Sequence, residues 1–363
     1  MPSSSFPSAL LLLPLATVGA VALLYRNSKE RNNRRRRRKG PQRRVVVVKL
    51  GGSSVTDKAK VETLNTATLG WAGGAVASAV NPSYRSLNCS EYDEESASGN
   101  NDDCGKPAFV IVHGAGSFGH HAAREYGLRG QTEPPPFSRG RGEDEEKEGK
   151  RRRRDMTGLA AARLSVQTLN RHVVSALIKA GINAVGMSPG LSTPGLEAHG
   201  GDEQGGASAL VRAVEDALSA GLVPVLHGDA CLYGPDGAGI LGGDTLVEIL
   251  ATGLDGVKGA VFLTDVDGVY TSDPKVQNDA ELLRVVEIDK STGRVLTHVA
   301  AGGSTHAHDV TGGLETKLGS AAGVARSGSP VIIARCGSAD AERALKGGIK
   351  DMERGTVVRL ARL

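Results

Sequence analysis

Short apolar runs that end in glycine turns constrain the fold of this chain more than any other feature. The first run, Val45–Leu50, is broken only by Lys49 and leads directly into Gly51 and Gly52. Uninterrupted β-branched runs of this kind are typical of strands that are buried on both faces of a parallel sheet. Four further runs have the same character, namely Ala108–His113, Val223–Leu226, Gly259–Thr264 and Pro330–Ala334.

Segments with helical periodicity separate these runs. The clearest is Thr157–Ala180, and Val211–Ala220 and Gly313–Arg326 are two others. Strands that alternate with helices predict a doubly wound α/β sheet. A last strand at Gly355 and Thr356 would close this sheet.

The chain before Arg44 has a different composition, and we predict a boundary between a segment 1–43 and a domain 44–363. Residues 9–24 form an apolar run with no Lys or Arg before it, and a basic stretch follows from Arg26 to Arg44. Basic residues after an apolar run keep the rest of a chain on the cytosolic side. We therefore interpret residues 9–24 as a membrane anchor or targeting segment of a cytosol-facing enzyme. The alternative is a cleaved peptide that targets an organelle.

Two polar stretches interrupt the domain, at about residues 81–106 and 132–154. Neither can bury enough apolar surface to offset the entropy of ordering, so we predict that both are disordered. For the second stretch, a solvated loop is favoured over a regulatory or docking role. Much of the positive charge lies in the runs 34–39 and 150–154, so the net charge of +4 does not indicate nucleic-acid binding. The four cysteines form no CxxC pair, and no metal site is predicted.

The turn after the first run has the residues that a phosphate site needs. Bare main-chain amides of Gly51 and Gly52 can approach phosphate oxygens without interference from a Cβ atom. Lys49 precedes them and Lys58 follows, and phosphoryl transfer depends on positive charge of this kind. The pattern is not a Walker A loop, and the alternative is a plain turn with surface lysines.

A second glycine-rich motif runs from His113 to His120. Three glycines in it permit close contact between the backbone and an anion at the start of a helix over Ala122–Tyr126. His120 follows this loop directly, and its imidazole can donate a hydrogen bond to a phosphate oxygen.

Carboxylates follow two later apolar stretches. Asp229 ends a His-Gly-Asp triplet, and Asp244 follows Gly243 at the end of Ile240–Asp244. Either carboxylate could orient a lysine, and Gly243 could approach a substrate closely. An N-cap role for Asp244 on a helix over Leu246–Leu250 is the alternative.

Two further motifs lie nearer the C-terminus. Asp265 comes just after a strand, where ligands bind in open α/β sheets. A Thr-Gly-Gly turn that ends at Gly313 opens a helix, and Lys317 on its first turns could reach nucleotide phosphates.

Taken together, these motifs resemble the amino-acid-kinase superfamily over about residues 45–357, outside the two insertions. The block Gly-Ser-Phe-Gly-His that ends at His120 is similar to the isopentenyl phosphate kinase family, as is the Asp-Val-Thr-Gly-Gly form of the later turn. The resemblance implies a three-layer αβα sandwich with a mostly parallel central sheet. It also implies that the chain uses ATP and Mg²⁺ to phosphorylate isopentenyl phosphate to isopentenyl diphosphate.

The resemblance also implies roles for individual residues. Lys49, Lys58 and His120 would be catalytic, and Ala115, His120 and Gly243 would bind the substrate. The nucleotide would contact Lys49, Leu50, Gly51, Gly52, Ser53, Gly116, Asp265, Gly313 and Lys317. The chain departs from the family at Ala115, where glycine is common, at His121, where proline is usual, and at Gly242, where serine is common.

Two other functions remain open. One is a kinase of the same fold that acts on a carboxylate such as acetylglutamate, although the His120 block argues against it. The other is a nucleotide-binding sensor without activity, although the three lysines argue against that. A small-molecule substrate and a homodimer are expected by analogy with the fold.

Overall fold

The computed structural model describes residues 43–57, 59–80, 107–128, 145–190, 206–233, 237–272, 277, 279–297, 313–349 and 352–361. The chain divides into two units, Met1–Gln42 and Arg43–Leu363, and all of the described residues belong to the second. The boundary lies one residue before the predicted position.

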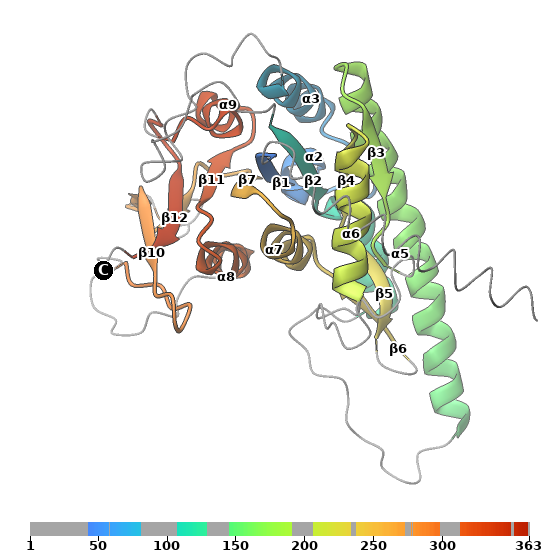
Figure 1. Ribbon diagram of the computed structural model, residues 1–363. Helices are drawn as coiled ribbons and strands as arrows, with labels where there is room; N and C mark the ends of the chain where they lie inside the picture. The colour runs from blue at the N-terminus through green and yellow to red at the C-terminus, as the bar shows by residue number, and fades with distance from the viewer. Residues whose placement is uncertain are drawn as a thin grey trace, which may run out of the picture. The chain divides into compact units, whose positions relative to one another are not determined.

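An eight-stranded sheet forms the centre of this unit, in the order β10-β12-β11-β7-β1-β2-β4-β3 (Figure 1). All neighbouring strands pair in parallel except β11 and β12. The strands are β1 (Val45–Leu50), β2 (Ala108–His113), β3 (Ala184–Met187), β4 (Val223–His227), β7 (Val257–Thr264), β10 (Val285–Ile288), β11 (Val331–Arg335) and β12 (Thr356–Leu360).

Helices cover both faces of the sheet because alternate side chains of its buried strands point in opposite directions. In β1, Val46 and Val48 pack towards α3, α5 and α9, whereas Val45 and Val47 pack towards α6, α7 and α8. Figure 1 shows α3 and α9 on one side of the sheet and α7 and α8 on the other. The predicted three-layer αβα sandwich is confirmed. These helices are α3 (Thr66–Val80), α5 (Glu145–Lys179), α6 (Gly206–Ser219), α7 (Gly243–Gly253), α8 (Gly313–Arg326) and α9 (Ala339–Lys346).

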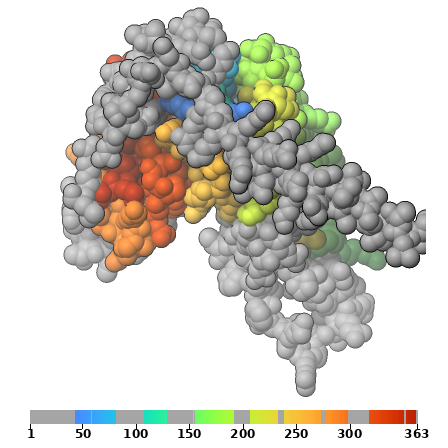
Figure 2. Space-filling model, viewed as in Figure 1, coloured from blue at the N-terminus to red at the C-terminus, as the bar shows by residue number. Residues whose placement is uncertain are grey.

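Smaller elements lie around this frame. The hairpin of β5 (Asp229–Tyr233) and β6 (Gly237–Leu241) leaves the sheet directly after β4, and β8 (Val269–Tyr270) pairs with β9 (Leu282–Leu283). Two helices, α2 (Gly52–Val55) and α4 (Gly116–Tyr126), begin at the ends of β1 and β2. In space-filling form, the C-terminal elements and the green part of α5 occupy opposite sides of α7 (Figure 2).

Two sequence predictions are corrected by these elements. Helix α5 begins at Glu145, so the disorder predicted for 132–154 is wrong for residues 145–154. Glu, Lys and Arg are good helix formers, and acidic residues here precede basic ones by three or four positions, which favours a helix. Strand β12 does not close the sheet, because it lies between β10 and β11, and β10 is the edge strand.

Among the described residues, no helix combines the length and the apolar character that crossing a membrane requires. Residues 9–24 and 81–106 lie outside the described residues. The membrane tether, the cytosol-facing or organellar location and the homodimer stay predictions.

Candidate active site

The site lies at one edge of the sheet, where the carboxyl ends of neighbouring parallel strands coincide. Leu50 of β1 is the register partner of His113 in β2 and of Leu263 in β7, and His113 is the partner of His227 in β4. A cavity of about 230 Å³ opens beyond these ends. It is lined by Lys49, Gly51, Gly52, Ser53, Gly114, Ala115, Gly116, Gly119, His120, Ala123, Ala162, Val166, Gly228, Asp229, Ala230, Ile240, Gly242, Gly243 and Asp244.

The two glycine turns that follow β1 and β2 touch each other backbone to backbone. A Cβ atom on Gly52 would lie 2.8 Å from Gly116 Cα, and one on Gly114 would lie 2.8 Å from Gly52 N. Gly116 also has a φ of +55°, a conformation that favours glycine. Thr56 joins the turns, because its Oγ1 donates to Gly52 O (2.7 Å) and accepts from Ser117 N (2.9 Å). The residues at which the two turns touch, Gly52, Gly114 and Gly116, therefore have to be glycines.

Helices α4 and α7 direct their N-termini at the cavity. Their N-cap residues are Ala115 and Gly242, both on the cavity wall, and neither cap has a side chain that accepts from the first amides. The first amides of a helix lack intrahelical partners and carry a partial positive charge, which suits an anion. The alternative N-cap role for Asp244 is wrong, since Gly242 is the N-cap and Asp244 lies within the first turn.

Lys49 is the buried cation of the site. Only 6% of the residue is exposed, and its Nζ forms an ion pair with an oxygen of Asp244. The same nitrogen lies 5.2 Å from the ring centre of Phe262, on the neighbouring strand β7. The prediction that Asp244 orients a lysine is confirmed. The Asp244 carboxylate of α7 therefore fixes the position of the Lys49 ammonium group on the cavity wall.

Asp229 has a different partner from the predicted lysine. Its Oδ2 accepts from Arg163 Nη1 (2.8 Å) and from the amide of Gly190 (2.9 Å), and its Oδ1 accepts from the amide of Ala230 (2.9 Å). Burial raises the pKa of Asp229, while His227 and Arg163 oppose that rise. Sequence reasoning missed Arg163, because it is one of many arginines and nothing in the periodicity of α5 indicates a partner 66 positions away.

Part of the cavity lining is apolar. Ala162 and Val166 come from α5, and Ile240 comes from the β5–β6 hairpin. Leu159, Ala162, Ala230 and Ala238 form a small buried cluster at this part of the lining. His120 lies on α4 at the cavity, so an imidazole, two helix N-termini and aliphatic side chains border the same space.

Several residues predicted to contact the nucleotide lie near these turns. Ser53 lines the cavity and its Oγ donates to Asp265 Oδ1 (3.3 Å), although Asp265 itself is not on the cavity wall. Gly313 begins α8. The side chain of Lys317 and the whole of Lys58 lie outside what the structure describes, so both roles stay predictions.

Leu50 differs from its neighbours in this turn in the direction of its side chain. Its side chain is 1% exposed and packs in the core, and its carbonyl accepts from Gly114 N (2.9 Å). The side chain of Leu50 therefore does not line the cavity, its carbonyl joins the first strand to the second glycine turn, and its contact with the nucleotide stays a prediction.

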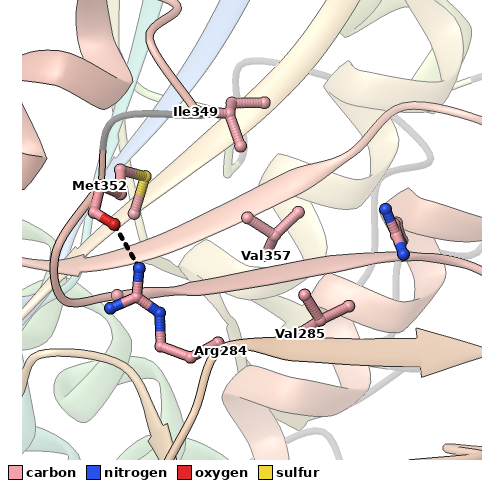
Figure 3. Close-up of a pocket in the computed structure, with 7 residues that line it drawn as sticks. Arg284, Val285, Ile349, Met352 and Val357 are labelled. Atoms are coloured by element: carbon pink, nitrogen blue, oxygen red, sulfur yellow. Dashed lines mark hydrogen bonds between the residues drawn. The ribbon is translucent and has the colours of Figure 1, made fainter.

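A second cavity of about 200 Å³ lies beside β10 and β12 and has a different lining (Figure 3). Its walls include Val285, Ile349 and Val357, and Arg284 donates to the carbonyl of Met352. None of the glycine turns described above reaches it. Within the described ranges, no three or more His, Cys, Asp or Glu side chains are grouped to hold a metal ion.

The central sheet is mostly parallel, and paired glycine turns, two helix N-termini and a buried lysine lie at the carboxyl ends of its strands. This arrangement is typical of α/β proteins that bind phosphate groups. Comparison with known proteins identifies the family. The profile of the Amino acid kinase family matches residues 44–335, and the chain belongs to this family.

Several similar proteins within the family are isopentenyl phosphate kinases. The chain is 36% identical over 270 residues to the isopentenyl phosphate kinase of Arabidopsis thaliana, which covers 70% of this chain and 73% of that protein. It is 34% identical over 217 residues to the isopentenyl phosphate kinase of Methanothermobacter thermautotrophicus, which covers 58% of this chain and 70% of that protein. A solved structure described as "X-ray structures of isopentenyl phosphate kinase" matches with a TM-score of 0.59 and 27% identity, over 86% of this chain and 99% of that one.

Glutamate 5-kinases match over shorter segments. That of Deinococcus radiodurans is 34% identical over 122 residues, which is 33% of this chain and 31% of that protein. The isopentenyl phosphate kinases thus match along most of their own length, whereas this glutamate 5-kinase does not.

Proposed function

We propose that this chain is a kinase that transfers the γ-phosphoryl group of ATP to isopentenyl phosphate and forms isopentenyl diphosphate. The observation that supports it most is the mixed lining of the cavity. Lys49, His120 and main-chain amides line it together with the aliphatic side chains of Ala162, Val166 and Ile240. An acceptor with a charged phosphate and a short hydrocarbon tail needs both kinds of group.

The acceptor phosphate would lie at the start of α4. There the Ala115 amide belongs to an N-terminus with a partial positive charge, and His120 lies one turn further on. Gly243 begins α7 and also lines the cavity, and the absence of a side chain there lets the acceptor approach the backbone. The hydrocarbon tail would then lie against α5.

The nucleotide phosphates would lie against Gly51, Gly52 and Ser53, with Lys49 between the two substrates. Asp244 is paired with Lys49, and Asp265 accepts from Ser53 and from Thr264 Oγ1 (3.1 Å). Because these carboxylates already have partners, Mg²⁺ would arrive bound to the nucleotide phosphates, as is common in kinases. There it would neutralise charge that develops on the phosphates.

The chemistry needs positioning and charge more than proton transfer. An oxygen of the acceptor phosphate forms a new bond to the γ-phosphorus of ATP, the bond to the β–γ bridging oxygen breaks, and ADP leaves with that electron pair. The attacking oxygen is already ionised near neutral pH, so no general base is required. Lys49 and the helix N-termini would stabilise the charge of the transferring group.

Purified protein incubated with ATP and each of three acceptors tests this proposal. We expect formation of ADP with isopentenyl phosphate, and with dimethylallyl phosphate as a related alkyl phosphate, but not with acetylglutamate. Turnover of acetylglutamate alone would favour the carboxylate kinase. Nucleotide binding without turnover of any acceptor would favour the sensor.

Replacing His120 with alanine tests whether this residue binds the acceptor or the nucleotide. We expect the KM for isopentenyl phosphate to rise about tenfold or more, because a charge-assisted hydrogen bond to phosphate is lost. The KM for ATP should stay within about twofold, since His120 lies on the acceptor side. Steady-state kinetics with each substrate varied in turn measures both values. His121→Ala is the matched control, because His121 is the next residue but is not on the cavity wall. Equal changes in both KM values would remove His120 from the acceptor site.

A further inference from the structure

Two buried histidines occupy equivalent positions beneath the cavity. His113 is the last residue of β2, His227 is the last residue of β4, and the two are register partners. Their ring centres are 5.7 Å apart, and both residues are fully buried. Neither lines the cavity, so neither is placed to touch a substrate.

Each histidine is hydrogen-bonded to the carbonyl of the glycine that follows it. His113 Nδ1 lies 3.0 Å from Gly114 O, and His227 Nδ1 lies 3.1 Å from Gly228 O. The amides of the same glycines continue the ladder of the sheet, since Gly114 N donates to Leu50 O (2.9 Å) and Gly228 N donates to His113 O (3.0 Å). Both polar groups of each glycine are therefore bonded, and the backbone has little freedom to rotate there.

The partners of His113 determine which nitrogen has the proton. A carbonyl oxygen can only accept, so Nδ1 is the donor to Gly114 O. Asn170 Nδ2 donates to Val225 O (3.1 Å) and lies 3.1 Å from His113 Nε2, so Nε2 is the acceptor. A proton on Nε2 would face a second donor. Burial and the neighbouring His227 lower the pKa of His113 to about 3, which agrees with a neutral ring.

His227 has the same arrangement with different partners. Its Nε2 lies 3.0 Å from Ser188 Oγ, which accepts from Gln167 Nε2 (3.1 Å) and can therefore donate to the ring. Burial lowers the pKa of His227, although Asp229 opposes this. Gln167 and Asn170 are three residues apart on α5 and so share one face of that helix. Helix α5 therefore bears on both rings, directly at His113 through Asn170 and at His227 through Ser188.

The orientation of the Gly114 peptide decides where the next amide points. In a trans peptide the N–H lies opposite the C=O, so a carbonyl held by the buried ring turns the amide of Ala115 to the other side. Ala115 is on the cavity wall. A Cβ atom on Gly228 would lie 3.2 Å from Gly243 N and 3.9 Å from Ala115 N, so Gly228 itself lies beside both amides.

We propose that His113 and His227 are positioning residues, which act as neutral Nδ1–H donors and hold the Gly114 and Gly228 peptides so that the amides beside them bind the acceptor phosphate. This inference rests on the proposed function, because it assigns the Ala115 amide to that phosphate. Neither ring transfers a proton to a substrate. Their effect is to fix a main-chain donor before the substrate arrives, and preorganised donors of this kind contribute strongly to transition-state stabilisation.

Two variants of His113 that differ only in the placement of one amide test the proposal. The Asn side chain puts an N–H near the position of Nδ1, whereas Gln places its amide near Nε2 and leaves Gly114 O without that donor. We expect His113→Gln to raise the KM for isopentenyl phosphate about tenfold, equivalent to about 1.4 kcal/mol, and to change the KM for ATP less than about twofold. We expect His113→Asn to recover most of the loss. Thermal denaturation of both variants measures any general loss of stability.

The proposal would be overturned if His113→Gln and His113→Asn had the same KM for isopentenyl phosphate. It would also be overturned if the KM values for ATP and for isopentenyl phosphate changed equally. A measurement on the unchanged protein covers the case in which a variant does not fold. Nitrogen spectra of ¹⁵N-histidine-labelled protein at neutral pH distinguish the two neutral tautomers and the cation. We expect the Nδ1–H form for His113 and His227, and an Nε2–H form or a cation at either ring contradicts the proposal. If the wild type does not phosphorylate isopentenyl phosphate, the proposed function fails, and the tautomers still decide whether the rings hold these peptides.

Discussion

Replacing Lys49 with methionine should lower kcat by about 100- to 1,000-fold, the loss that follows removal of one preorganised donor from a transition state. Methionine keeps much of the length and apolar character of the lysine stem, so packing beside Phe262 is largely kept and the charge is removed. The KM values should change less than kcat, because the charge matters most while the phosphoryl group is in transfer. Single-turnover measurements at saturating ATP and isopentenyl phosphate test this directly.

The ion pair with Asp244 means that removal of Lys49 changes stability as well as activity, and a second substitution at Asp244 separates the two effects. Removal of Lys49 leaves the Asp244 carboxylate, which is one-fifth exposed, without its partner, and we expect a loss of about 3 kcal/mol in unfolding free energy. In the double variant Lys49→Met/Asp244→Asn, stability should return while kcat stays low. Lys179→Met, at the exposed end of α5, is the matched surface control and should change neither. A double variant with both stability and activity restored would show that Lys49 acts only through folding.

Replacing Gly52 with alanine should lower kcat/KM by about 100-fold, because the new Cβ atom forces the two glycine turns apart and misplaces the groups on both. The methyl group would meet the backbone of Gly116, which cannot move aside as a flexible side chain can. Overpacking of this kind costs about 1–3 kcal/mol of stability. Chemical denaturation and steady-state kinetics on the same preparation separate the two effects.

The matched control for this change is Gly70→Ala on α3. A Cβ atom at Gly70 meets nothing within 4 Å, and alanine is favoured over glycine in a helix by about 1 kcal/mol. We expect this variant to be more stable and fully active. If Gly52→Ala is also fully active, the close contact between the turns does not matter for the chemistry.

The sequence indicated much of the site because its chemistry is local in the chain. Lys49, the glycine turns and His120 lie in continuous motifs directly after apolar runs, and the end of a parallel strand is where ligands bind. Parallel strands place their carboxyl ends at one edge, so motifs far apart in sequence were expected to meet. The cavity confirms that Lys49, Ala115, His120 and Gly243 share one space.

Other parts of the site depend on partners that no pattern along the chain reveals. Arg163 meets Asp229, and Asn170 meets His113, because α5 crosses the sheet beside β2 and β4. A motif also does not distinguish a residue whose side chain faces a ligand from one whose side chain enters the core, as that of Leu50 does. The alternation of faces along β1 decides that difference.

The sequence by itself determined the alternation of strands and helices, the glycine turns at the strand ends and the residues able to contact phosphate, since each depends on neighbours within a few positions. The tertiary structure alone decided which carboxylate pairs with Lys49 and which nitrogens of the buried histidines have their protons. Those properties depend on contacts between residues tens to hundreds of positions apart, such as the 195 that separate Lys49 from Asp244. Only the packed chain brings such groups within hydrogen-bonding distance.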